Sequence, residues 1–182
     1  MSKELPLYGF GVVGGGSSSY LYNLGKQKYA WGIDAWFFGS PDSYAQDYPI
    51  PTLNDDGSIS LILSNVKGST TKQVSGVYHL LKDFDLTNVN QLVFEGFGKR
   101  TDKMTTTAGR SSVYIAVVPR TASYWGSDAV AKTSFSCTTT ETEYTKTLDV
   151  SGITGSYDVV IGMLTTYIAE VCVTMKTLKA VR

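Results

Sequence analysis

The sequence is poor in charge, histidine and cysteine, and each shortage excludes a class of protein. Lys and Arg together number 16 and Asp and Glu number 16, so the formal net charge of the 182 residues is zero. A chain without excess positive charge lacks the electrostatic attraction that drives nucleic-acid binding. One histidine and two cysteines are too few for a zinc site built from repeated His and Cys ligands. We therefore expect no nucleic-acid partner and no metal or other cofactor.

Long hydrophobic runs are also missing. No stretch approaches the roughly 20 apolar residues of a membrane-spanning helix, and the opening MSKELP lacks the apolar core of a secretory signal peptide. We therefore expect a soluble protein that does not use Sec export and has no membrane partner. Apolar residues still make up 42% of the chain and charged residues only 18%, which predicts one folded domain with an uncharged polar surface.

From Ser58 onward, hydrophobicity alternates with a period of two, which is typical of half-buried β-strands. Ile59, Leu61 and Leu63 alternate in the first run, which follows the turn signal NDDG. Clusters of Gly, Ser, Thr and Asn separate the runs, and the only helical turn we expect is at Leu86 to Asn90. This spacing predicts a single all-β jelly-roll sandwich. The further runs are Val74 to Leu81, Leu92 to Gly98, Val113 to Val118, Ala129 to Cys137, Glu143 to Asp149, Tyr157 to Leu164 and Ala169 to Val181.

The first 56 residues are aromatic and glycine-rich but lack this period. We interpret Tyr20 to Ser40 as opening strands of the sandwich, the alternative being an arm that packs on a neighbouring subunit. Residues 1–19 are expected to be such an arm, because GGGSSS at its end has linker composition. The domain would then span residues 20–182. The expected assembly residues of the arm are Leu5, Leu7, Tyr8, Phe10, Val12 and Val13.

The chain carries no convincing catalytic motif. His79 is the only histidine, it has no recognisable partner, and no Ser lies in a G-x-S-x-G elbow. Gly9 to Gly14 has the G-x-G-x-x-G spacing, but no helix signal follows it as a dinucleotide site requires. A glycosidase needs only two neighbouring carboxylates. That alternative stays open beside the expectation of a non-enzyme, with the candidates Asp55, Asp83, Asp85 and Glu95.

Aromatic residues carry the most plausible binding chemistry. Tyr124, Trp125 and Asp128 fall in a turn-rich stretch where adjacent rings are hard to bury together. Sugar rings stack their C–H faces on such side chains, while sugar hydroxyls need polar partners. Trp31 and Trp36 are further candidates. For the Tyr124–Trp125 loop, a protein interface and packing within the core remain alternatives, and for the other two tryptophans core packing is favoured.

The two cysteines, Cys137 and Cys172, both fall on expected strands. They could form a disulfide if those strands were neighbours with suitable geometry. We favour two buried free thiols, since such sparse cysteine usage is unlike a disulfide-stapled scaffold.

Several segments resemble a known fold family. The stretch DFDLTNVNQLVFEG from Asp83, the hairpin TLDVSGITGSYDVVIG from Thr147 and the closing strand Val171 to Leu178 resemble galactose-binding-like jelly rolls of carbohydrate-binding modules and phage virion proteins. LYNLG from Leu21 with WGIDAW from Trp31 resembles the opening of phage appendage proteins from Gram-positive hosts. The resemblance implies a non-catalytic binding or structural fold and carries over no ligand-site residue.

The sequence therefore leads us to expect a non-catalytic phage virion component. It would be a capsid decoration, head-fibre or tail-appendage subunit, made in the host cytoplasm and located in the virion. Its expected partners are further copies of itself, other virion proteins and cell-surface glycans. The alternative is a carbohydrate-binding module that acts as a glycan-binding domain. Fold alone does not decide between them.

Overall fold

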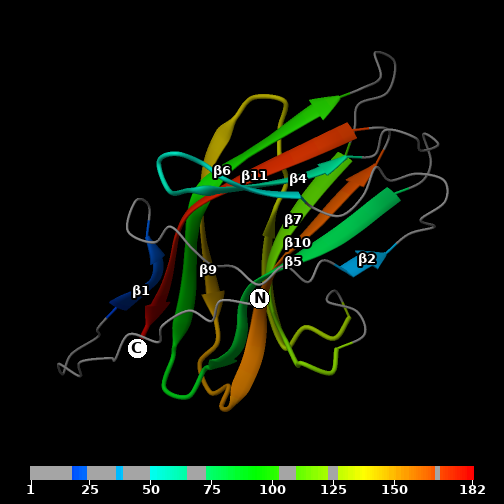
Figure 1. Cartoon of the computed structure of the whole chain (residues 1–182). Coiled ribbons are helices and arrows are strands. Elements are labelled where there is room, and N and C mark those ends of the chain that lie inside the picture. The colour runs from blue at the N-terminus through cyan, green and yellow to red at the C-terminus, as the bar shows by residue number, and fades with distance from the viewer. Residues whose placement is uncertain are drawn as a thin grey trace, which may run out of the picture.

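The structure is a computed structural model of the chain. It describes residues 18–23, 36–38, 50–64, 73–102, 110–122, 127–166 and 169–182. These residues form eleven β-strands in two antiparallel sheets and contain no helix (Figure 1). Within these same ranges, no helix could span a membrane.

The first sheet has six strands in the order β3-β4-β11-β6-β9, with β1 also paired to β11. Its longest strands, β6 and β11, lie side by side at its centre. The strands are β1 (Ser18–Asn23), β3 (Ile50–Leu53), β4 (Ile59–Ser64), β6 (Gln91–Asp102), β9 (Thr142–Asp149) and β11 (Ala169–Val181).

The second sheet has five strands in the order β2-β5-β10-β7-β8. Its central strands β10 and β7 are buried on both sides along much of their length, since β7 is fully buried from Ile115 to Val118. The strands are β2 (Trp36–Phe38), β5 (Gln73–Asp85), β7 (Arg110–Val118), β8 (Ala131–Phe135) and β10 (Ser156–Thr166).

The hydrophobic core lies between the two sheets, and every second residue of a strand contributes to it. In β6, buried residues alternate with partly exposed ones from Leu92 to Gly98, as the sequence period predicted. The largest fully buried side chains come from both sheets, which confirms the predicted all-β sandwich. They are Tyr78, Phe94, Leu61, Leu63, Leu80, Leu86, Leu92, Ile115, Ile161, Met163 and Met175.

Two turns show where the sequence signals were right and wrong. In the predicted turn before β4, Gly57 has φ +86°, and its N–H donates to the Asn54 carbonyl at 2.9 Å. The segment Leu86 to Asn90 is a tight turn and not the predicted helical one. Asn88 has φ +63°, a left-handed conformation that Asn tolerates because its short side chain costs little there. This conformation ends helical geometry after one hydrogen-bonded turn.

The predictions for the N-terminal region fall largely outside the described residues. Residues 1–17, and with them all six expected assembly residues of the arm, lie outside them. β1 begins at Ser18, two residues before the expected domain start, and β2 lies within the stretch interpreted as opening strands. The arm and its boundary stay predictions.

Candidate functional site

The outer face of the second sheet carries a small apolar cluster apart from the core. Its four members are fully buried. Their side chains point away from the first sheet, because their neighbours along the strands, such as Tyr78 and Ile161, point into the core and successive side chains alternate. Tyr114, Ala122 and Ala129 pack against the cluster. We call this set the outer cluster: Val77 of β5, Ala116 and Val118 of β7, and Val160 of β10.

The two described parts of the connection between β7 and β8, residues 119–122 and 127–130, lie against the outer cluster. Ala122 and Ala129 on either side of its middle both pack there. Backbone hydrogen bonds hold both ends: Ala122 N donates to the Pro119 carbonyl at 2.9 Å, and Val130 N donates to the Val117 carbonyl at 2.9 Å. The connection is therefore fixed at its beginning and its end on this face of the sheet.

Two predicted aromatic segments converge on this face. Trp36 opens β2, and its backbone pairs with Val77 of the outer cluster. Trp125 falls in sequence between Ala122 and Ala129, which pack against the same cluster. Ala122 and Ala129 therefore pack on the same outer cluster whose member Val77 pairs with Trp36. Tyr124, Trp125 and Trp31 themselves lie outside the described residues.

A cross-strand row runs across the face from β2 to β8. The register aligns Trp36 with Val77, Val77 with Gly162, Gly162 with Tyr114, and Tyr114 with Ser134. At the usual strand spacing, Trp36 and Tyr114 are three strands apart, about 14 Å. Val77 and Gly162, both small and buried, separate these two aromatic positions. The row therefore aligns Trp36 and Tyr114 with two small, buried residues between them.

Carboxylates and hydroxyls lie near the ends of the same face. Asp128, the predicted polar partner of the aromatic loop, is half-buried and accepts a hydrogen bond from Ser127 Oγ at 2.9 Å. Asp158 of β10 pairs with Val118, and its Oδ1 accepts the Asp83 N–H at 2.9 Å. Asp83 has φ +54°, so this bond stabilises a backbone conformation that is otherwise costly. Polar side chains therefore border this face, and those of Asp128 and Asp158 already accept hydrogen bonds within the protein.

The outer face of the first sheet is chemically different, because its charged groups pair with one another. Glu95 of β6 accepts from Thr177 Oγ1 at 2.5 Å and from Lys179 Nζ at 2.9 Å. Lys176, at a bulge of β11, lies 2.8 Å from Glu143 and 4.8 Å above the centre of the Phe97 ring. These contacts occupy the polar atoms that a ligand would need, so this face is the weaker candidate.

The Glu95 pairing predicts a pH-dependent stability. The Thr177 hydrogen bond and then the Lys179 contact lower the pKa of Glu95 in the folded state. The contribution of Glu95 to the unfolding free energy is therefore present above its unfolded pKa of about 4.3. It is lost as the pH falls through the lower pKa of the folded state. Glu95→Gln should lower the unfolding free energy by up to about 1 kcal/mol at neutral pH. Urea titrations should show that difference disappear in strong acid.

The more exposed pair of Glu143 with Lys176 provides the control for this prediction. The Glu143 side chain is 58% exposed against 31% for Glu95, so solvent screens its ion pair more strongly. Glu143→Gln should change stability less at every pH. A Glu95→Gln variant with an unchanged pH profile would contradict the account.

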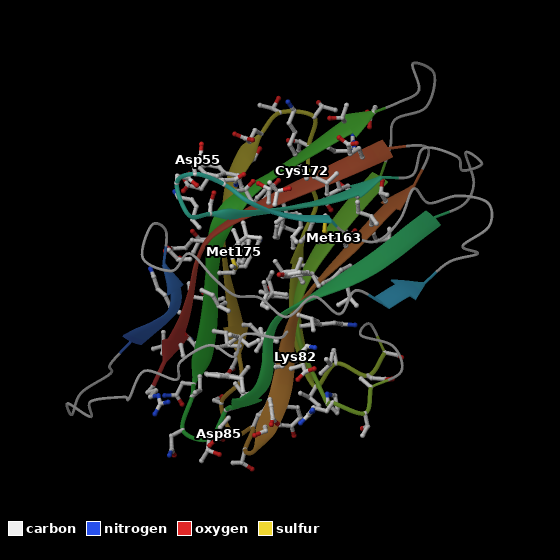
Figure 2. All side chains as sticks on the ribbon, in the orientation of Figure 1. Asp55, Lys82, Asp85, Met163, Cys172 and Met175 are labelled. Atoms are coloured by element: carbon white, nitrogen blue, oxygen red, sulfur yellow. The ribbon has the colours of Figure 1, made fainter. Side chains whose placement is uncertain are left out.

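The four candidate glycosidase carboxylates do not all lie in one place, and only Asp83 and Asp85, two positions apart at the end of β5, are neighbours in the chain. Asp55 and Asp85 lie at opposite ends of the sandwich (Figure 2). Asp83 pairs with Arg120 at 3.3 Å on the surface, and Glu95 pairs with Lys179. Among the described residues, no group of three or more His, Cys, Asp and Glu could hold a metal ion.

Both cysteines are free thiols, as favoured from the sequence. Cys137 is buried, and burial raises its pKa to about 11. Cys172 is only partly buried, because it occupies an outward position of β11 between the core residues Val171 and Val173 (Figure 2). Burial also raises the pKa of Cys172. Neither thiol has the lowered pKa of a reactive nucleophile.

Comparison with known proteins identifies similar folds but no family. No family model and no curated protein matches the chain. A family 30 carbohydrate-binding module has a TM-score of 0.50 at 10% identity, over 90% of this chain and 98% of that one. The N-terminal cellulose-binding domain of β-1,4-glucanase C from Cellulomonas fimi has a TM-score of 0.44 at 13% identity, over 80% and 86%.

A phage protein also occurs among the similar structures. The enzymatically active domain of tailspike protein 4 from bacteriophage CBA120 has a TM-score of 0.44 at 9% identity. The match covers 92% of this chain and 19% of that chain, so this chain spans about a fifth of the length of that structure. The likeness to the family 30 module, at 10% identity, shows a shared fold and no shared activity. The chain therefore has the β-sandwich fold of a family 30 carbohydrate-binding module.

Proposed function

We propose that this protein is a non-catalytic carbohydrate-binding domain that holds glycans on the outer face of its second sheet. The observation that carries the proposal is the convergence of β2, with Trp36, and the connection containing Trp125 on the outer cluster. Both segments contain aromatic residues, and Ala122 and Ala129, which flank Trp125 in the sequence, pack on the cluster with which Trp36 aligns. The fold shared with a family 30 carbohydrate-binding module agrees with this role.

The chemistry of the face suits an uncharged polysaccharide. Flat aromatic residues on both sides of the buried centre could stack on the C–H faces of sugar rings. Asp128 and the exposed Ser134 place oxygen atoms nearby for sugar hydroxyls. Because β5, β10 and β7 form a continuous hydrogen-bonded sheet beneath it, the face is rigid before a ligand arrives, which lowers the entropic cost of binding.

The virion role and location expected from the sequence remain proposals. They are compatible with glycan binding, since a virion appendage can contact the host through surface sugars. The assembly residues of the arm lie outside the described residues, so the support for this role is the sequence resemblance alone.

Native affinity electrophoresis against a panel of neutral polysaccharides tests the glycan proposal. At least one polysaccharide should retard the wild-type protein. Trp36→Ala and Trp125→Ala should each weaken that retention by about tenfold to a hundredfold, or about 1.4 to 2.7 kcal/mol. Phe97→Ala, on the outer face of the other sheet, is the matched aromatic control and should retain wild-type binding.

Circular dichroism must show that each variant keeps the β-sheet spectrum, so that lost retention reports on binding. Two results would contradict the proposal. One is a wild-type protein that no polysaccharide in the panel retards. The other is unchanged retention of folded Trp36→Ala and Trp125→Ala proteins.

A further inference from the structure

The sheet edges of this sandwich differ in how they are protected from pairing with another chain. A strand at an edge presents free N–H and C=O groups, and proteins block such edges with charges, proline or short strands. Among the described strands, β1, β3 and β9 are edges of the first sheet, and β2 and β8 are edges of the second.

Four of these edges carry a recognisable block. β3 contains Pro51, which has no N–H to donate. β9 contains Lys146, with Glu143 and Asp149 three positions to either side, and β8 contains Lys132. β2 is only three residues long. Each of them therefore disfavours the addition of a foreign strand.

β1 has none of these features. Its six residues, SSYLYN, include no charge and no proline, and two of them are tyrosines, which favour strands. Within the described part of the chain, β1 pairs with β11 on one side and with no strand on the other. Among the described edge strands longer than three residues, β1 is the one that carries no such block.

The edge that contains β1 is also stepped. β4 and β1 pair with the same side of β11, β4 along Met175 to Glu170 and β1 along Thr177 to Val181. β3 adds a further strand beside β4 but not beside β1. In Figure 1, β1 accordingly lies by itself next to the C-terminal end of β11. The sheet therefore extends one strand further beside β4, where β3 is added, than it does beside β1.

We propose that β1 is a self-association edge, where β1 of a second copy pairs antiparallel about a twofold axis. Antiparallel pairing of a strand with its own copy is isologous, so one interface closes the dimer. The two edges are complementary in shape. The β1 strand of the second copy lies beside β1 of the first, in line with β3, which lies beside β4. β3 of each copy then lies beyond the end of the other copy's β1, so the two strands do not overlap. The first sheets of both copies become one continuous sheet.

Light scattering of the full-length wild-type protein tests this assignment and needs no glycan, so its outcome is independent of the proposed ligand. The expected mass is twice that of the chain. Tyr20→Glu should halve this mass, because the two introduced carboxylates, one from each copy, would lie at the same β1–β1 interface and repel each other. Within the chain, position 20 pairs with Lys179, whose positive charge accommodates the new carboxylate. Thr52→Glu, on the proline-blocked β3, is the matched control and should stay dimeric.

Hydrogen exchange on the wild-type protein gives a second readout that requires no variant. The amides of residues 18–23 that point away from β11 should lose protection when the protein is diluted below the dissociation constant of the dimer, while those of β6 should keep it. A monomer at all concentrations, a trimer or larger ring, or a dimer whose β1 amides ignore dilution would each overturn the proposal.

Discussion

Replacing Gly96 with alanine should destabilise the protein by about 3 kcal/mol, at the upper end of what overpacking costs. An added Cβ would overlap the carbonyl oxygen of Thr174 in β11 and would lie 2.9 Å from Cζ of Phe94. The first of these neighbours is backbone. Because β6 is hydrogen-bonded between β11 and β9, the clash cannot be relieved by rotating a side chain.

Urea-induced unfolding of Gly96→Ala gives this free energy directly. Lys99→Ala is the matched control, since Lys99 lies on the same strand with an exposed side chain. It should change stability by less than about 0.5 kcal/mol. If Gly96→Ala fell within that same small range, the close approach of β6 and β11 would be wrong.

Replacing Phe135 with alanine should cost about 3–5 kcal/mol, the range for removing a buried aromatic ring. Phe135 ends β8 in the second sheet and is 6% exposed. Its ring stacks on Tyr144 of the first sheet with centroids 4.1 Å apart and lies 6.1 Å from the Phe94 ring. Gly98 makes room for this stack, since a Cβ there would approach the Phe135 ring to 3.1 Å. The ring therefore joins the two sheets.

Tyr144→Phe separates ring packing from hydrogen bonding at the same stack. It keeps the ring but removes the hydrogen bond from Tyr144 Oη to the Ser136 carbonyl, which is 2.8 Å long. The expected loss is about 1 kcal/mol. Thermal and urea unfolding of both variants should rank Phe135→Ala as far more damaging, and equal losses would contradict the role of Phe135 between the sheets.

The strands could be predicted from the sequence because their signal is local. The alternation at Ile59, Leu61 and Leu63 and the turn at Gly57 both depend on residues a few positions apart. Pairing is a different matter. β1 pairs with β11 from the opposite end of the chain, and no local pattern records that register.

The candidate site was predicted only in part for the same reason. The sequence singles out Trp36 as an aromatic residue, whereas its alignment with Val77 and Tyr114 follows from the pairing of β2, β5, β10 and β7. Tyr114 gives no signal of its own, because it falls inside the apolar run VYIAVV of a strand buried on both faces. Its position in the row becomes visible only through its register with Gly162.

Mapping of amide chemical shifts during titration with an oligosaccharide of the retarding polysaccharide tests the central claim most directly. The account predicts that the largest shifts fall on the second sheet, at Val77, Gly162, Tyr114 and Ser134, and saturate with the ligand. Shifts concentrated on the first sheet around Glu95, with the second sheet unchanged, would contradict it.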